Sequence, residues 1–164
     1  MASGCARRAR LMRTDMQLTK FTDYCLRVLM YLSAREDALA TVHEISGAYR
    51  VSHHHLMKVV QHLNAKGYVE TVRGNKGGIR LARKPKFINL GEVVRDCEQN
   101  FAIVECFNPV NTDCPLLPAC VLRASLKEAT KSFFATLDRY TIADLVGGQR
   151  PVTFSKQKIP IRAA

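Results

Sequence analysis

Residues 41–82, TVHEISGAYRVSHHHLMKVVQHLNAKGYVETVRGNKGGIRLA, contain two helical patterns followed by a hairpin pattern. Thr41 and Glu44 form a T-x-x-E capping box, which predicts a short helix beginning at residue 42. Ser52 provides the N-cap of a second helix, because apolar residues at helical spacing follow it: Leu56, Val59, Val60 and Leu63. Two short helices with a brief connection between them predict a helix-turn-helix.

A hairpin follows the second helix, which ends at Gly67 as a C′ residue. The alternating residues at 68–72 (YVETV) and 79–82 (IRLA) predict two strands. Their connection, RGNKGG at 73–78, contains two cations and three glycines. A helix-turn-helix followed by a cationic hairpin is the winged-helix pattern, and we expect the hairpin to serve as the wing.

The predicted recognition helix, residues 52–65, carries polar side chains opposite its apolar stripe. We expect it to enter the major groove of DNA, where side chains read base edges. The cations of the hairpin are expected to contact the DNA backbone or the minor groove. The predicted DNA-contacting residues are Ser52, His53, His54, Lys58, Gln61, Arg73, Lys76 and Arg80.

The overall charge also favours a polyanionic partner such as double-stranded DNA. The chain of 164 residues has 25 Lys and Arg against 14 Asp and Glu, a formal net charge of +11. The hairpin turn RGNKGG lacks the spacing of a phosphate loop, so a nucleotide-binding site is not expected there. The consecutive histidines 53–55 point in directions about 100° apart on a helix, so they do not converge on one metal ion. With neither a catalytic motif nor an apolar run long enough to span a membrane, we expect no enzyme and no membrane partner.

Another helix is predicted before this region. From Thr22, taken as its N-cap, the apolar residues Cys25, Val28, Leu29 and Leu32 share one face. Asp23 falls about 160° from Cys25 around the helix, so it points away from the stripe. By periodicity alone, Asp23 is a surface residue that stabilises the helix dipole. We interpret residues 1–15, with four arginines, as a disordered basic arm or upstream extension, and residues 16–85 as the DNA-binding head.

Residues 86–120 are expected to hold a helix from residue 89, with Cys97 buried, followed by an irregular loop. Pro109, Pro115 and Pro118 make a continuous helix over 101–120 unfavourable. The loop contains Cys106, Cys114 and Cys120 at the spacing C-x7-C-x5-C. An irregular loop can direct several sulfurs inward. The spacing leaves three alternatives open: an iron–sulfur cluster, zinc, or redox and structural thiols.

A long final helix, residues 121–146, is predicted to mediate dimerisation. Its apolar residues follow a seam like that of a coiled coil: Leu122, Leu126, Ala129, Phe133, Leu137 and Tyr140. A two-fold dimer would match a palindromic DNA site. Residues 147–164 have the composition of a disordered tail. The predicted fold is therefore mainly α, with a winged helix-turn-helix head, a small β-hairpin wing, a cysteine loop and a long C-terminal dimerisation helix.

Three stretches together resemble the winged-helix iron–sulfur regulators. They are MQLTKFTDYCLRVLMYLS at 16–33, the segment from SHHHLMK to GGIRLA at 52–82, and the cysteine loop ending in CPLLPAC at 114–120. The resemblance spans about residues 16–145 and is closest to the nitric-oxide-sensing repressors of that family. It implies a cytoplasmic bacterial homodimer that binds a DNA operator.

The resemblance also implies the ligands of a cluster, [2Fe–2S] or [4Fe–4S], one per subunit. Three loop cysteines hold it in the family, and they match Cys106, Cys114 and Cys120. In some members an aspartate at the start of the first helix, donated by the other subunit, is the fourth ligand; Asp23 matches it. Regulators of cluster assembly instead place a histidine where this chain has Arg123. The implied effector is nitric oxide. The alternatives are sensing of oxygen, redox state or iron–sulfur status, and a zinc-stabilised regulator.

Overall fold

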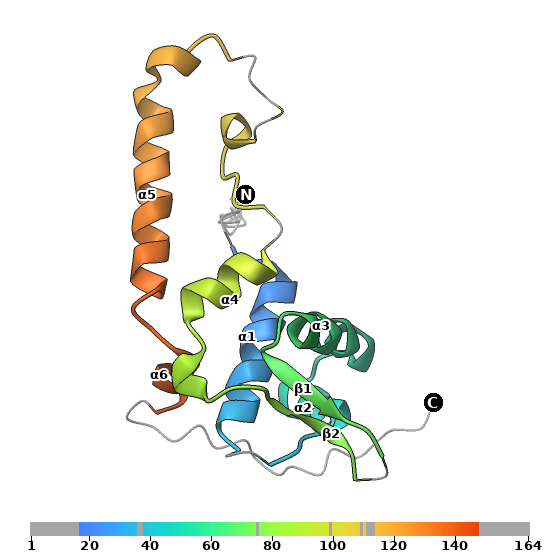
Figure 1. The fold of residues 1–164 in the computed structure, drawn as a ribbon. Coiled ribbons are helices and arrows are strands. Elements are labelled where there is room, and N and C mark those ends of the chain that lie inside the picture. Colours follow the sequence, from blue (N-terminus) through green and yellow to red (C-terminus); the bar gives the residue numbers. More distant parts are fainter. Residues whose placement is uncertain are drawn as a thin grey trace, which may run out of the picture.

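The computed structural model describes residues 17–35, 38–74, 76–98, 100–108, 110 and 114–147. The predicted arm at 1–15 and most of the predicted tail lie outside the described residues. The elements are α1 (Lys20–Ser33), α2 (Val42–Tyr49), α3 (His53–Ala65), β1 (Val69–Val72), β2 (Gly78–Leu81), α4 (Leu90–Cys97), α5 (Val121–Leu137) and α6 (Ile142–Val146) (Figure 1). Short 3-10 turns lie at Pro85–Phe87, Glu105–Phe107 and Leu117–Ala119.

The first helix begins earlier than the sequence pattern predicts. Thr19, not Thr22, is the N-cap of α1, and its hydroxyl accepts the backbone N–H of Thr22 at 3.2 Å. Thr22 is instead buried in the first turn, where its own hydroxyl lies 3.1 Å from that of Thr19. The prediction of Thr22 as N-cap is therefore wrong. Two threonines three residues apart are equivalent candidates for a cap until burial distinguishes them.

The helix-turn-helix is confirmed by its local hydrogen bonds. Thr41 and Glu44 form the predicted capping box at the start of α2. Arg50 takes a left-handed conformation (φ 55°) at the end of α2, and the Val51 N–H then donates to the Ser46 carbonyl at 3.2 Å. Ser52 is the N-cap of α3, as predicted, although its side chain makes no capping hydrogen bond. The turn therefore depends on backbone geometry and on Ser46, whose hydroxyl donates to the Val51 carbonyl.

The wing is a two-stranded hairpin, as predicted. Gly67, at φ 72°, allows the chain to leave α3 in a left-handed conformation that glycine adopts without strain. β1 and β2 are antiparallel, with Val69 opposite Leu81. Ile79 is buried and exchanges two backbone hydrogen bonds with Ala40, which joins the wing to the segment before α2.

The core lies between α1, α3, α4 and the first turn of α6. Its fully or nearly fully buried side chains include Leu29, Leu56, Leu63 and Ile142. Cys25 of α1 and Cys97 of α4 belong to the same core, so the prediction that Cys97 is buried is confirmed. Within the described residues, no helix is both long and apolar enough to cross a membrane.

The predicted single helix over 121–146 is wrong, because the chain bends after Leu137. The Asn89 side chain donates to the Asp138 carbonyl at 2.7 Å, and the Ile142 N–H donates to the Ile88 carbonyl at 2.9 Å. A capping box between Thr141 and Asp144 then begins α6, which packs on α1. In Figure 1, α5 rises away from the head, and Tyr140, assigned to its seam, lies beyond its end.

Candidate DNA-binding surface and cysteine loop

The predicted recognition helix presents its polar face to solvent. Its apolar stripe is buried, whereas the five residues predicted to contact DNA from this helix and its N-cap are exposed: Ser52, His53, His54, Lys58 and Gln61. Helical spacing therefore assigned the correct faces. The exposed face carries hydrogen-bond donors and acceptors of the kind that distinguish base edges.

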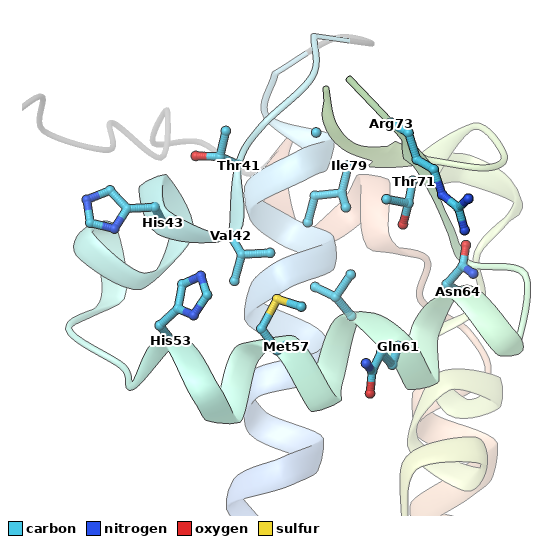
Figure 2. Close-up of a pocket in the computed structure, with 12 residues that line it drawn as sticks. Thr41, Val42, His43, His53, Met57, Gln61, Asn64, Thr71, Arg73 and Ile79 are labelled. Carbon is cyan, nitrogen blue, oxygen red and sulfur yellow. The ribbon is translucent and has the colours of Figure 1, made fainter. Parts of the chain in front are cut away.

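Residues of this helix, of α2 and of the wing line a groove of about 690 Å³ (Figure 2). Arg73 and Asn64 lie toward one end of it, and His43 and His53 lie toward the other. Gln61 and Met57 of α3 also line it. The groove brings residues from α2, α3 and the hairpin to one surface, as a winged-helix reading head requires.

Of the residues predicted to contact DNA, His53, Gln61 and Arg73 line this groove, and the polar lining residues that the sequence analysis missed include Asn64 and His43. Asn64 lies one helical turn beyond Gln61, so extending the polar face by one turn identifies it. His43 belongs to α2, and the capping box gave no indication that this residue lines the same groove as α3. Both are exposed.

The three predicted wing cations do not share one side of the hairpin. Arg73 and Lys76 are exposed at the turn, and Arg73 lines the groove beside α3. Arg80 follows the buried Ile79 and therefore points the other way, where it lines a second groove of about 600 Å³ with Lys84 and Lys86. Arg80 also forms an ion pair with Glu70 on the neighbouring strand. Arg73 is thus better placed than Arg80 to reach DNA held by α3.

The cysteine loop, residues 98–120, connects α4 to α5. Cys106 and Cys120 are half-buried, Cys114 is exposed, and all three are free thiols. The Cys120 sulfur caps α5 by accepting the backbone N–H of Arg123 at 3.4 Å, while the Arg123 guanidinium donates to the Cys106 carbonyl at 3.4 Å. Arg123 therefore ties the first and last of the three cysteines together.

The side chains of the loop are of the type that binds iron–sulfur clusters in proteins. Cysteine thiolates are the preferred ligands of such a cluster, and the loop presents three of these side chains, the last of them at the N-terminus of α5. Among the described residues, no three His, Cys, Asp or Glu side chains lie close enough together to hold a metal ion. The fit therefore rests on donor chemistry and on the absence of disulfides among these three thiols.

Asp23 lies in the first turn of α1 and points away from the core, as predicted. Its carboxylate pairs with Arg27 at 2.9 Å, and the two side chains are 43% and 42% exposed. An exposed pair one helical turn apart contributes little to stability. Giving up this pair would therefore cost the protein little, and the carboxylate is accessible to a neighbouring molecule.

The exposed apolar residues of α5 form a surface that the head does not cover. No residue of α5 is buried, and Val121 and Leu122 are 77% and 66% exposed. Phe133, in the same predicted seam, is 40% exposed. Apolar residues aligned along an uncovered helix are typical of a protein–protein interface.

Comparison with known proteins agrees with this arrangement. Residues 18–148 match the Rrf2 family, described as an iron-dependent transcriptional regulator. The HTH-type transcriptional regulator NsrR of Geobacillus kaustophilus is 48% identical over 132 residues, which are 80% of this chain and 90% of the relative. Its namesake in Bacillus subtilis is 47% identical over 138 residues, 84% of this chain and 94% of the relative.

Solved structures show the same fold. The T. potens IscR structure superimposes with a TM-score of 0.66 at 22% identity, covering 80% of this chain and 87% of the other. CymR, the global cysteine regulator of B. subtilis, gives a TM-score of 0.63 at 25% identity, covering 80% and 97%. The family and these relatives are transcriptional regulators, which confirms the prediction of a regulator rather than an enzyme.

Proposed function

This chain belongs to the Rrf2 family of iron-dependent transcriptional regulators, and we propose that it is a cytoplasmic, homodimeric repressor whose bound iron–sulfur cluster senses nitric oxide. The observation that carries the proposal is the joint presence of an exposed polar face on α3 and three free thiols in one loop. The name of its relatives, NsrR, and its resemblance to the nitric-oxide-sensing repressors support the choice of effector.

The proposed operator is a palindrome in double-stranded DNA. Each head places α3 in the major groove, with His54, Lys58 and Gln61 nearest the bases and Ser52 and His53 at the helix start. Arg73, beside α3, and Lys76, at the turn, supply the main contacts of the wing, and Arg80 contributes a further phosphate contact from the opposite face of the hairpin. Two heads related by a two-fold axis through α5 bind two half-sites about one helical turn apart.

The proposed ligands of the cluster are Cys106, Cys114 and Cys120, with Asp23 of the partner subunit as the fourth. When bound, the cluster supplies iron atoms with which nitric oxide reacts. Asp23 would supply one oxygen ligand from the first turn of α1, and its loss would disconnect one head from the cysteine loop of the other subunit. Only an effector that distinguishes the connected from the disconnected state can shift the balance between them.

Anaerobic purification followed by DNA binding tests the proposal. We expect a coloured protein that contains both iron and acid-labile sulfide. A duplex selected from a random library with this protein is expected to lose affinity when a nitric oxide donor is added. Zinc without sulfide would indicate a zinc-stabilised regulator instead. A response to oxygen or peroxide but not to nitric oxide would contradict the proposed effector.

Variants of α3 and the wing separate base readout from phosphate contact. Gln61→Ala is expected to lower affinity for the selected duplex by about 1–3 kcal/mol, with little change for unrelated duplexes. Arg73→Ala is expected to weaken binding to the selected duplex and to unrelated duplexes alike. It should also reduce the slope of log affinity against log salt by about 1. Fluorescence anisotropy at four salt concentrations measures the affinities and the salt slope. Lys131→Ala, on α5, is the control and should match the unaltered protein.

A further inference from the structure

The last turn of α4 contacts three other parts of the protein through neighbouring residues. The Arg95 guanidinium donates to both carboxylate oxygens of Asp138, at the end of α5, at 2.7 and 2.6 Å. The Glu98 carboxylate accepts the backbone N–H of Thr19, the N-cap of α1, at 2.7 Å. Between them, Asp96 faces α3 and the hairpin. Because the cysteine loop starts at Glu98, this turn lies between the loop and the recognition helix.

Asp96 holds both the end of α3 and the start of the wing. Its carboxylate accepts Lys66 Nζ at 2.9 Å and the Tyr68 hydroxyl at 2.7 Å. Its backbone carbonyl accepts His62 Nε2 at 3.1 Å. His62 lies in the last turn of α3, Lys66 is the C-cap, and Tyr68 directly precedes β1.

The protonation states of this group favour a stable link. Burial would raise the pKa of Asp96, but the hydrogen bonds from Tyr68 and Lys66 lower it below its ordinary value. Burial and the hydrogen bond to Asp96 raise the pKa of Tyr68. At neutral pH Asp96 is thus a carboxylate, and Tyr68, which is fully buried, remains a donor. Removing the acceptor leaves a buried hydroxyl without this partner, which is unfavourable.

Because the hydrogen bonds of Asp96 hold the last turn of α3, a small tilt at this end displaces the opposite end of the helix. The His62 ring also packs edge-on against Phe21 of α1, with ring centroids 5.2 Å apart, so the last turn of α3 is held from two sides. α3 has 13 residues and is therefore about 20 Å long at roughly 1.5 Å per residue. A tilt of about 5° at this end moves the other by roughly 2 Å, whereas hydrogen bonds to base edges tolerate only a few tenths of an ångström.

We propose that Asp96 is a positioning residue for DNA recognition, which orients α3 and the wing and transmits the state of the cysteine loop to both. The inference rests on the proposed function, in which α3 reads DNA and the loop holds the cluster. Asp96 itself contacts neither the DNA nor the cluster in this proposal. Its effect passes through His62, Lys66 and Tyr68.

The test compares Asp96→Ala with Glu92→Gln, an exposed carboxylate on the same helix that lies 3.9 Å from Arg83. Affinity for the selected duplex is measured for cluster-loaded and cluster-free protein. We expect the affinity ratio between the two forms to fall by about tenfold or more in Asp96→Ala and to stay unchanged in Glu92→Gln. Asp96→Asn, which keeps one acceptor for Tyr68, should give an intermediate ratio.

Hydrogen exchange in cluster-free protein provides a second readout. Amides of residues 62–68 are expected to exchange faster in Asp96→Ala than in Glu92→Gln. If Asp96 only adds stability, its removal lowers the DNA affinity of the cluster-loaded and cluster-free forms equally and leaves the ratio of the two affinities unchanged. That result would overturn the inference. If Asp96→Ala does not fold, Lys66→Met removes one partner of Asp96 at an exposed position. An unchanged affinity ratio in Lys66→Met would also overturn the inference.

Gln61→Ala separates failure of this inference from failure of the proposed function. If Gln61→Ala lowers specific affinity while Asp96→Ala and Lys66→Met leave the ratio unchanged, α3 reads DNA and Asp96 does not position it. If Gln61→Ala has no effect on specific affinity, the proposed role of α3 is itself wrong, and the inference is overturned with it.

Discussion

Serine substitution of Cys106, Cys114 or Cys120, one at a time, is expected to remove most or all of the bound iron and sulfide. A thiolate is a far better ligand for such a cluster than a hydroxyl, and three cysteines leave no spare sulfur in the loop. With the cluster lost, the response of DNA binding to nitric oxide should disappear. Iron and sulfide counting, visible absorption and anisotropy after anaerobic purification measure these effects.

Cys97→Ala is the matched control, because Cys97 is a free cysteine nine residues before Cys106 in the chain but buried in the core. We expect it to retain iron and sulfide and to lose some thermal stability from the smaller side chain. Asp23→Ala is expected to keep part of the cluster and to weaken the nitric oxide response. A loop variant that keeps full iron, sulfide and nitric oxide sensitivity would show that these cysteines are not the ligands.

Disruption of the exposed seam of α5 is expected to convert the proposed dimer into a monomer. Leu122→Asp combined with Ala129→Asp places two charges two helical turns apart on the apolar face, where each copy would meet the same charge in its partner. Affinity for a palindromic duplex should fall by about 10²–10⁴, because the second half-site is no longer bound by a tethered head. Sedimentation velocity and anisotropy measure the two effects.

Ala124→Asp combined with Ala135→Asp adds the same charge to the opposite, exposed face of α5 and serves as the control. It should remain dimeric and bind the palindrome with unchanged affinity. A seam variant that still sediments as a dimer would place the interface elsewhere on the molecule. A seam variant that becomes monomeric yet binds the palindrome as tightly as before would show that pairing of the heads does not contribute to affinity.

The sequence predicted the reading head because its signals are local. The capping box at Thr41, the left-handed glycine at residue 67 and the apolar stripe of α3 each depend on residues a few positions apart. Steric and hydrogen-bonding rules at that range hold with little influence from the rest of the fold. The faces of α3, the wing and the burial of Cys97 were therefore predictable.

Thr22 and Arg80 show where local signals are insufficient. Thr19 and Thr22 both satisfy the cap pattern, and only packing of α1 against the core buries Thr22. Charge alone placed Arg80 with Arg73, but the buried side chain of Ile79 determines which face of the wing Arg80 takes. The predicted ligand role of Asp23 depends on a partner subunit and stays a prediction.

The amino-acid sequence by itself thus determined a winged head, a loop with three thiols and a helix with an uncovered apolar face. Tertiary structure decided that the last helix breaks after Leu137 and that Asp96 joins α4 to α3. The bonds responsible connect residues 49 positions apart at Asn89 and Asp138, and 28 apart at Tyr68 and Asp96. Such pairings have no periodic signature, because they form only after the core has brought the segments together.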